Sequence, residues 1–161
     1  MPATPTKQDL KDELVRALGA ELGTLERAQQ LTREAATHEE NKPENDKDTR
    51  ALEQSYLARG QAARVEELRT GLAEAQSMPV RAFAEGSPIA LGALIVAEEN
   101  DATITLLLAP AGGGSRLANG AVQVVTPKSP LGRALLGKRA GDDCEVPLAG
   151  KNRELAILEV R

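Results

Sequence analysis

Residues 129–146 read SPLGRALLGKRAGDDCEV, and this stretch carries the sharpest structural signals in the chain. Ser129 predicts a helix N-cap, because its short oxygen side chain can accept an N–H of the first helical turn. Pro130 then occupies the first helical position, where its fixed φ fits and no N–H is needed. Gly137 predicts the end of the helix, since glycine adopts the left-handed conformation without steric cost. The stretch therefore predicts one short helix that ends near Leu136, followed by a strand.

The segments around this stretch have the two-residue period of β-strands. Thr103 to Leu106 alternate polar and apolar side chains, which predicts a half-buried strand. The sequences at 99–101 and 149–152 have the composition of tight turns. Residues 78–161 are therefore expected to form a small antiparallel β-domain with one short helix. The other expected strands lie at Ile89–Val96, Val122–Val124, Glu145–Val146 and Leu155–Val160.

Upstream of residue 78 the apolar period changes to that of an α-helix. Leucines recur at steps of four and three, and Thr6 with Asp9 predicts the start of the helix. The pattern weakens along the chain and runs to about Thr37. The apolar stripe consists of Leu10, Leu14, Leu18, Leu22 and Leu25, followed by Ala28 and Leu31.

A second helical pattern is expected from about Lys47 to Gln76. Between the two patterns Pro43 breaks the helix, because proline has no N–H and restricts the residue before it. Two helices joined by a short polar loop predict an antiparallel hairpin over residues 1–77, with its tip at about 38–48. The narrow stripe is typical of a coiled coil rather than a globular bundle. On the second helix it consists of Leu72, Leu68, Val65 and Ala58, with Leu52 or Ala51 further back.

The composition excludes several classes of function. The net charge is −4, without the basic footprint of a free-standing DNA-binding protein. Tyr56 and Phe83 are the only aromatic residues, too few for a platform that stacks single-stranded nucleic acid. Cys144 is the only cysteine, which excludes an intrachain disulfide and a Cys-rich metal site and fits a cytoplasmic protein. No 18-residue apolar run and no leader pattern are present, so we expect neither a membrane span nor a signal peptide.

Residues 129–138 and 141–146 together resemble the C-terminal signature of the Gre transcript cleavage factors, GreA and GreB. In that family the signature reads approximately S-P-[LIM]-[GA]-R-A-L-[LI]-G-K…G-D-x-[VC]-x-V. The order of a helical hairpin followed by a β-domain is similar to the family too. The resemblance implies an α+β fold, in which an N-terminal coiled-coil hairpin precedes an FKBP-like C-terminal domain.

The resemblance also implies a partner and an activity. Gre factors bind bacterial RNA polymerase beside its secondary channel, and the hairpin passes down that channel. Acids at the tip help to hold a Mg²⁺ ion in the polymerase active site, where the polymerase hydrolyses the RNA of a backtracked complex. Such a protein is not itself an enzyme and has no cofactor of its own. We expect a cytoplasmic monomer that contacts nascent RNA only indirectly and binds no membrane.

The tip of this chain departs from the family pattern, which reads approximately G-D-x-S-E-N. Aligning Pro43-Glu44-Asn45 with S-E-N places Glu44 on the family glutamate and Asn41 where the aspartate stands. Aligning from the second helix instead places Glu44 on the aspartate and Lys47 on the glutamate. The resemblance implies tip acids that assist the polymerase, here Glu44, Glu40 and Asp46. Of these, Glu44 and Glu40 are the candidates for the shared Mg²⁺ site.

The resemblance implies a second site, at which the C-terminal domain contacts the polymerase. The candidate residues are Lys128, Ser129, Pro130, Leu131 and Arg133. The family often has an acid directly before S-P, whereas this chain has Lys128. We therefore expect an altered docking contact, or one adapted to a different polymerase surface.

Three other functions remain open on the sequence. A Gre-like regulator or inhibitor could occupy the channel without stimulating cleavage. A prolyl isomerase would use the FKBP-like domain, although such sites are lined by aromatic side chains and this domain has only Phe83. A coiled-coil adaptor would have no role in transcription. The chain has no Ser-His-Asp arrangement, no metal-spaced His or Cys and no nucleotide-binding loop of its own.

Overall fold

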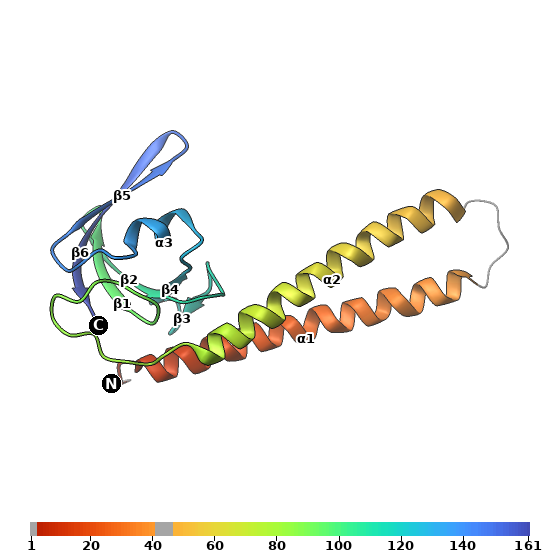
Figure 1. Ribbon diagram of the computed structural model, residues 1–161, viewed down its shortest axis with the longest axis horizontal. Coiled ribbons are helices and arrows are strands. Elements are labelled where there is room, and N and C mark those ends of the chain that lie inside the picture. The colour runs from red at the N-terminus through yellow and green to blue at the C-terminus, as the bar shows by residue number, and fades with distance from the viewer. Residues whose placement is uncertain (1–2, 41–46) are drawn as a thin grey trace. The chain divides into compact units, whose positions relative to one another are not determined.

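The computed structural model of the protein describes residues 3–40 and 47–161, and the side chains of 36, 38–40, 47 and 48 lie outside that description. Two long helices, α1 (Lys7–Glu40) and α2 (Lys47–Ser77), form the expected hairpin (Figure 1). The predicted helix break at Pro43 lies outside the described residues. Among the described residues no helix is long and apolar enough to cross a membrane.

The start of α1 is fixed by a reciprocal cap. Thr6 N donates to Asp9 Oδ2 over 2.8 Å, and Asp9 N donates to Thr6 Oγ1 over 3.1 Å. These two bonds satisfy backbone donors that have no partner inside the helix. The predicted start at Thr6 and Asp9 is confirmed.

The hairpin seam is apolar only over part of its length. Three of the expected leucines near the start of α1 are buried, and so are Val65 and Leu68 of α2. Farther along, Leu31 is 66% exposed and Leu52 is 56% exposed, so their assignment to the seam is wrong. Thr32 occupies the seam position instead. Leu31 precedes it by one residue and therefore points about 100° away around the helix axis. The buried leucines of α1 are Leu10, Leu14 and Leu18.

Thr32 and Gln61 replace leucine at the seam beyond that point. Gln61 Nε2 donates to Thr32 Oγ1 over 3.3 Å, and the Thr32 hydroxyl donates to Ala28 O over 3.0 Å. Gln61 Oε1 is buried without a hydrogen-bond partner among the described residues. The hairpin therefore has an apolar stretch and a polar stretch.

The chain divides into two compact units, Ala17–Leu72 and Met1–Arg16 with Ala73–Arg161. In the second unit the first turns of α1 are tied to residues of the C-terminal part. Lys11 Nζ donates to Met78 O over 2.8 Å, and both oxygens of Glu13 accept the Ala118 N–H at 3.0 and 3.2 Å. The division into domains 1–77 and 78–161 stays a prediction.

The C-terminal sheet is mixed rather than wholly antiparallel, with strand order β3-β4-β2-β1-β6-β5. The pairing of β2 with β4 is parallel, and the other strand pairs are antiparallel. A parallel pair needs a crossover of about a dozen residues. Here residues 109–121 supply it and include the short strand β3. The strands are β1 (Leu94–Glu99), β2 (Ala102–Leu108), β3 (Arg116–Leu117), β4 (Val122–Val125), β5 (Asp143–Leu148) and β6 (Lys151–Val160).

The predicted short helix is α3 (Pro130–Leu135), with Ser129 as its N-cap. Leu131 and Leu135 join an aliphatic core formed by the sheet, with Ile95 and Ile157 among its fully buried members. The turn after β1 has positive φ at Asn100 (52°) and Asp101 (62°). That geometry is typical of a tight hairpin turn. The fold class expected from the sequence, a helical hairpin followed by a sheet domain with one short helix, is confirmed.

Candidate functional site

The predicted tip acids lie at the limit of what the structure describes. Glu44 and Asp46 lie outside the described residues, and Glu40 ends α1 with its side chain outside the description. The two possible registers against the family tip therefore stay open. Among the described residues no group of three or more His, Cys, Asp or Glu side chains could hold a metal ion.

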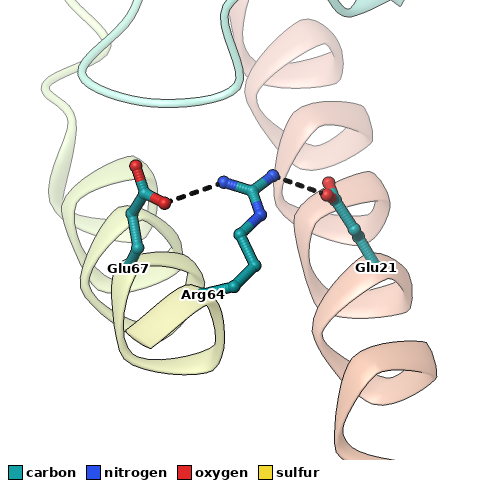
Figure 2. A network of polar contacts seen from close by, with 3 residues as sticks. All are labelled: Glu21, Arg64 and Glu67. Carbon is teal, nitrogen blue, oxygen red and sulfur yellow. Dashed lines mark hydrogen bonds and ion pairs between the residues drawn. The ribbon is translucent and has the colours of Figure 1, made fainter. Parts of the chain in front are cut away.

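Two arginines of α2 clamp the helices that lead to the tip. Arg64 Nη2 lies 2.8 Å from Glu21 Oε1 of α1, and its Nη1 lies 3.0 Å from Glu67 Oε2 (Figure 2). The hydrogen bonds that Arg64 donates to Glu67 and then to Glu21 raise the pKa of Arg64. The guanidinium therefore joins both helices with one planar group, whose fixed fork suits two carboxylates.

Arg69 repeats this arrangement. Its Nη2 lies 2.9 Å from Glu26 Oε1 of α1, and its Nη1 lies 2.6 Å from Glu66 Oε1. The hydrogen bonds that Arg69 donates to Glu26 and then to Glu66 raise the pKa of Arg69. Each arginine pairs with a glutamate 43 positions earlier in the chain.

The two clamps lie on opposite flanks of the seam. The step from Glu21 to Glu26 and the step from Arg64 to Arg69 each cover five residues, which is a rotation of about 140° around the helix axis. The seam residues Leu22, Leu25, Val65 and Leu68 fall between these positions. Charged pairs that flank an apolar seam are how coiled coils set the pairing of their helices. The clamps therefore add charged contacts between α1 and α2 beside the seam.

A second predicted site, the loop before α3, is held rigidly by its own hydrogen bonds. Ser129 Oγ accepts from Gly132 N over 3.0 Å and donates to Thr126 O over 2.8 Å. A Cβ built on Gly132 would stand 1.7 Å from Thr126 O, so the loop and the helix approach more closely than any side chain allows. Arg133 Nη1 donates to Lys128 O over 2.9 Å. These bonds fix the backbone on which the candidate docking residues stand.

The structure separates those candidates into surface and core. Lys128, Pro130 and Arg133 are exposed, and Ser129 is half-buried. Leu131 is only 8% exposed and packs in the core cluster. These four surface-accessible positions define what we call the docking face.

Sequence reasoning missed Leu136, which is 49% exposed beside the docking face in the chain. A signal was present, since neighbouring residues of a helix point about 100° apart and Leu135 and Leu136 cannot both face the core. A cavity of about 250 Å³ also adjoins the loop, lined by Ser129 and Pro130 together with the exposed Leu148 of β5. An apolar side chain of a partner would fit such a cavity.

Cys144 lies in the core. The residue is buried in β5, and burial raises the pKa of its thiol. It therefore acts as a small buried hydrophobic residue, because a thiol with a raised pKa is a poor nucleophile.

Comparisons with known proteins agree on one family. A sequence model described as "Transcription elongation factor, GreA/GreB, C-term" matches residues 89–161. "Transcription elongation factor GreA" of Halorhodospira halophila is 31% identical over 134 residues, which cover 82% of this chain and 80% of that protein.

Solved structures with similar features include the GreA factor homolog 1 (Gfh1) of Thermus thermophilus. It is 19% identical, covers 94% of both chains and has a TM-score of 0.39. A "prokaryotic transcription elongation factor GreA/GreB" from Nitrosomonas europaea is 21% identical, with a TM-score of 0.37. That similarity covers 71% of this chain and 94% of the other.

Proposed function

Because this chain belongs to the GreA/GreB family of transcription elongation factors, we propose that it binds bacterial RNA polymerase at the secondary channel and stimulates cleavage of backtracked RNA. In this proposal the hairpin carries the tip acids into the channel, and the docking face holds the polymerase. The polymerase performs the catalysis, and the chain contributes carboxylates without a cofactor of its own. The protein acts as a cytoplasmic monomer that contacts nascent RNA only indirectly.

The observation that carries the proposal is the clamped hairpin. Ion pairs join α1 to α2, and by sequence the segment between Glu40 and Lys47 links the two helices. That segment and its borders are rich in acids by sequence, namely Glu39, Glu40, Glu44, Asp46 and Asp48.

The chemistry follows from what carboxylates do for a cation. Carboxylate oxygens are preferred ligands of Mg²⁺, which usually keeps several waters and takes only one or two protein carboxylates. A bound Mg²⁺ lowers the pKa of its water and neutralises charge that develops on the phosphodiester. One or two tip acids are therefore enough when the polymerase supplies the remaining ligands. We propose Glu44 and Glu40 for this role, with Asp46 as a third candidate.

The test is an RNA cleavage assay on a backtracked elongation complex with Mg²⁺. We expect the protein to shorten the RNA, and Glu44→Gln to lower the cleavage rate by about tenfold or more, because the substitution removes a charge and a metal ligand. Glu74→Gln is the matched control, since Glu74 is an exposed glutamate of α2 far along the helix from the tip. Equal losses in both variants, or no cleavage at all, would contradict the cleavage role.

A second candidate function is a channel-occupying regulator without cleavage activity. It is favoured by one observation, which is that neither alignment of the tip preserves both family acids. In one alignment Asn41 stands in place of the aspartate, and in the other Lys47 stands in place of the glutamate. Tight polymerase binding combined with inhibited transcription and uncleaved RNA would select this function. Absence of binding would leave a shared fold without the shared partner.

A further inference from the structure

A cavity of about 710 Å³ lies within the unit that contains the sheet. It is bounded by the start of α1, by the segment 80–86 and by the end of β6. Cavities of this volume are typical of small-molecule sites. Apolar side chains, among them Val80 and Leu158, form much of the wall.

Two cations share one aromatic ring in this cavity. Lys7 Nζ lies 4.5 Å from the centroid of the Phe83 ring, and Arg81 Cζ lies 5.0 Å from the same centroid. Lys7 Nζ also donates to the Arg81 carbonyl oxygen over 2.8 Å, which holds the ammonium in place. Burial, and then the charge of Arg81, lower the pKa of Lys7. The two positive groups are therefore close enough to repel each other.

Among the described residues neither Lys7 nor Arg81 forms an ion pair. Glu159, also in the cavity wall, is occupied by Arg161, with bonds of 2.8 and 3.0 Å. Glu85 also lines the cavity. Arg81 is exposed, so its guanidinium is open to a ligand.

We infer that this cavity binds a small organic anion, whose charged group lies between Lys7 and Arg81. A guanidinium binds phosphate, sulfonate or carboxylate oxygens through two parallel N–H donors, and an ammonium adds a third contact. An aromatic or aliphatic body of the ligand packs on Val80 and Leu158, which are 41% and 49% exposed without it. Binding of the anion removes the repulsion between the cations. The inference is independent of any contact with polymerase.

The test is a fluorescence titration of the full chain with 8-anilinonaphthalene-1-sulfonate, an aromatic anion that becomes bright in apolar sites. We expect saturable binding of one probe per chain and a loss of affinity of about fivefold or more for Arg81→Gln. Arg81→Lys, which keeps the charge, should recover part of the affinity. Inorganic phosphate should compete weakly, because it carries the charge without the apolar body.

Lys151→Gln is the matched control, because Lys151 is an exposed cation of the same unit that does not line the cavity. An unchanged affinity in this variant, with NMR shifts of the Gly86 and Leu158 amides on binding, would support the site. Non-saturating fluorescence would overturn the inference. So would an equal loss of affinity in Lys151→Gln and Arg81→Gln.

Discussion

Arg64 binds Glu21 across the hairpin, with 2.8 Å between Nη2 and Oε1, although the two residues stand 43 positions apart in the chain (Figure 2). The pair joins α1 to α2 at the level where the apolar seam ends. Both side chains are about half exposed, at 48% each, so solvent and salt screen their attraction. The contact therefore adds little to the free energy of folding.

The variant Arg64→Gln tests this view of the clamp. We expect a loss of stability below about 1 kcal/mol that shrinks as salt is added, because the pair is exposed. Cleavage of backtracked RNA should fall no further than this small loss explains, because the buried leucines still hold α1 against α2. Chemical denaturation at low and high salt, beside the cleavage assay, gives both quantities. Arg59→Gln, at an exposed arginine without an ion pair among the described residues, should change neither.

The polar seam predicts uneven protection along the hairpin. The tip-ward part of the hairpin begins after Leu25 of α1. Amides of α1 and α2 in that part should exchange about tenfold faster or more than those beside Leu14 and Leu68, because few buried side chains hold it. Hydrogen exchange followed by mass spectrometry measures this directly. Uniform exchange along both helices would show that the seam is equally stable throughout.

Gln61→Leu should stabilise that stretch by about 1 kcal/mol, because it removes a buried carbonyl oxygen that has no partner among the described residues. Thr32 keeps a partner, since its hydroxyl still donates to Ala28 O. Slower exchange at residues 26–37 is the expected signature. Gln76→Leu, at an exposed position of α2, controls for the gain in helix propensity and should leave those amides unchanged.

Two glycine-to-alanine variants should have opposite effects. Gly132→Ala should destabilise the protein by about 3 kcal/mol or more, because the new Cβ would stand 1.7 Å from Thr126 O. Gly19→Ala should stabilise it by about 0.5–1 kcal/mol, since nothing lies within 4 Å of the new Cβ and alanine favours a helix. Urea denaturation of both variants measures the two signs. Destabilisation by Gly19→Ala, or a neutral Gly132→Ala, would contradict the packing described at these sites.

The docking face predicts a charge effect on polymerase affinity. We expect Lys128→Glu to weaken binding by about fivefold or more, because an exposed cation at the proposed contact becomes an anion. The dissociation constant for core polymerase, measured at two salt concentrations, checks this. Lys151→Glu makes the same change of net charge at an exposed residue that is not one of the four positions of the docking face. If both variants bind equally well, Lys128 does not contact the polymerase.

The cap of α1 predicts a specific pH dependence. The Thr6 N–H, and then the Thr6 hydroxyl, hold the pKa of Asp9 below its usual value. Because the folded pKa is depressed, this stabilisation is present above the unfolded pKa of about 4 and is lost as the pH falls through the folded value. The stability gap between the wild type and Asp9→Asn should therefore be larger at about pH 7 than at about pH 2. Thermal unfolding of both proteins at the two pH values measures it, and an equal gap would exclude an ionised cap.

The local signals of the sequence predicted the elements well. Ser129 and Pro130 marked α3 because capping depends on a few neighbouring residues, and Leu10, Leu14 and Leu18 marked the seam because their spacing matches one helix face. The parallel pairing of β2 with β4 was not predictable in this way, since strand order depends on contacts between distant segments. The same holds for the clamps, because a glutamate at Glu21 looks like any exposed helix residue until its partner is known.

The candidate sites show where the limit of sequence reasoning lies. Leu131 and Leu136 belong to the same motif, and only the direction of α3 against the sheet decides that the first is buried and the second exposed. The motif identified the segment but not the face of it that a partner can reach. The tip acids remain predictions from the resemblance.

Cys144 has a practical consequence for experiments on this protein. It is the only thiol of the chain, it is buried, and its burial raises its pKa, so maleimide reagents at neutral pH should leave it unmodified. A variant such as Thr49→Cys, at an exposed position of α2, would then be the single labelling site without removal of the native cysteine. A fluorophore attached there would report by energy transfer how deeply the hairpin enters a labelled polymerase. The native cysteine therefore does not have to be removed before the protein is labelled for single-molecule distance measurements.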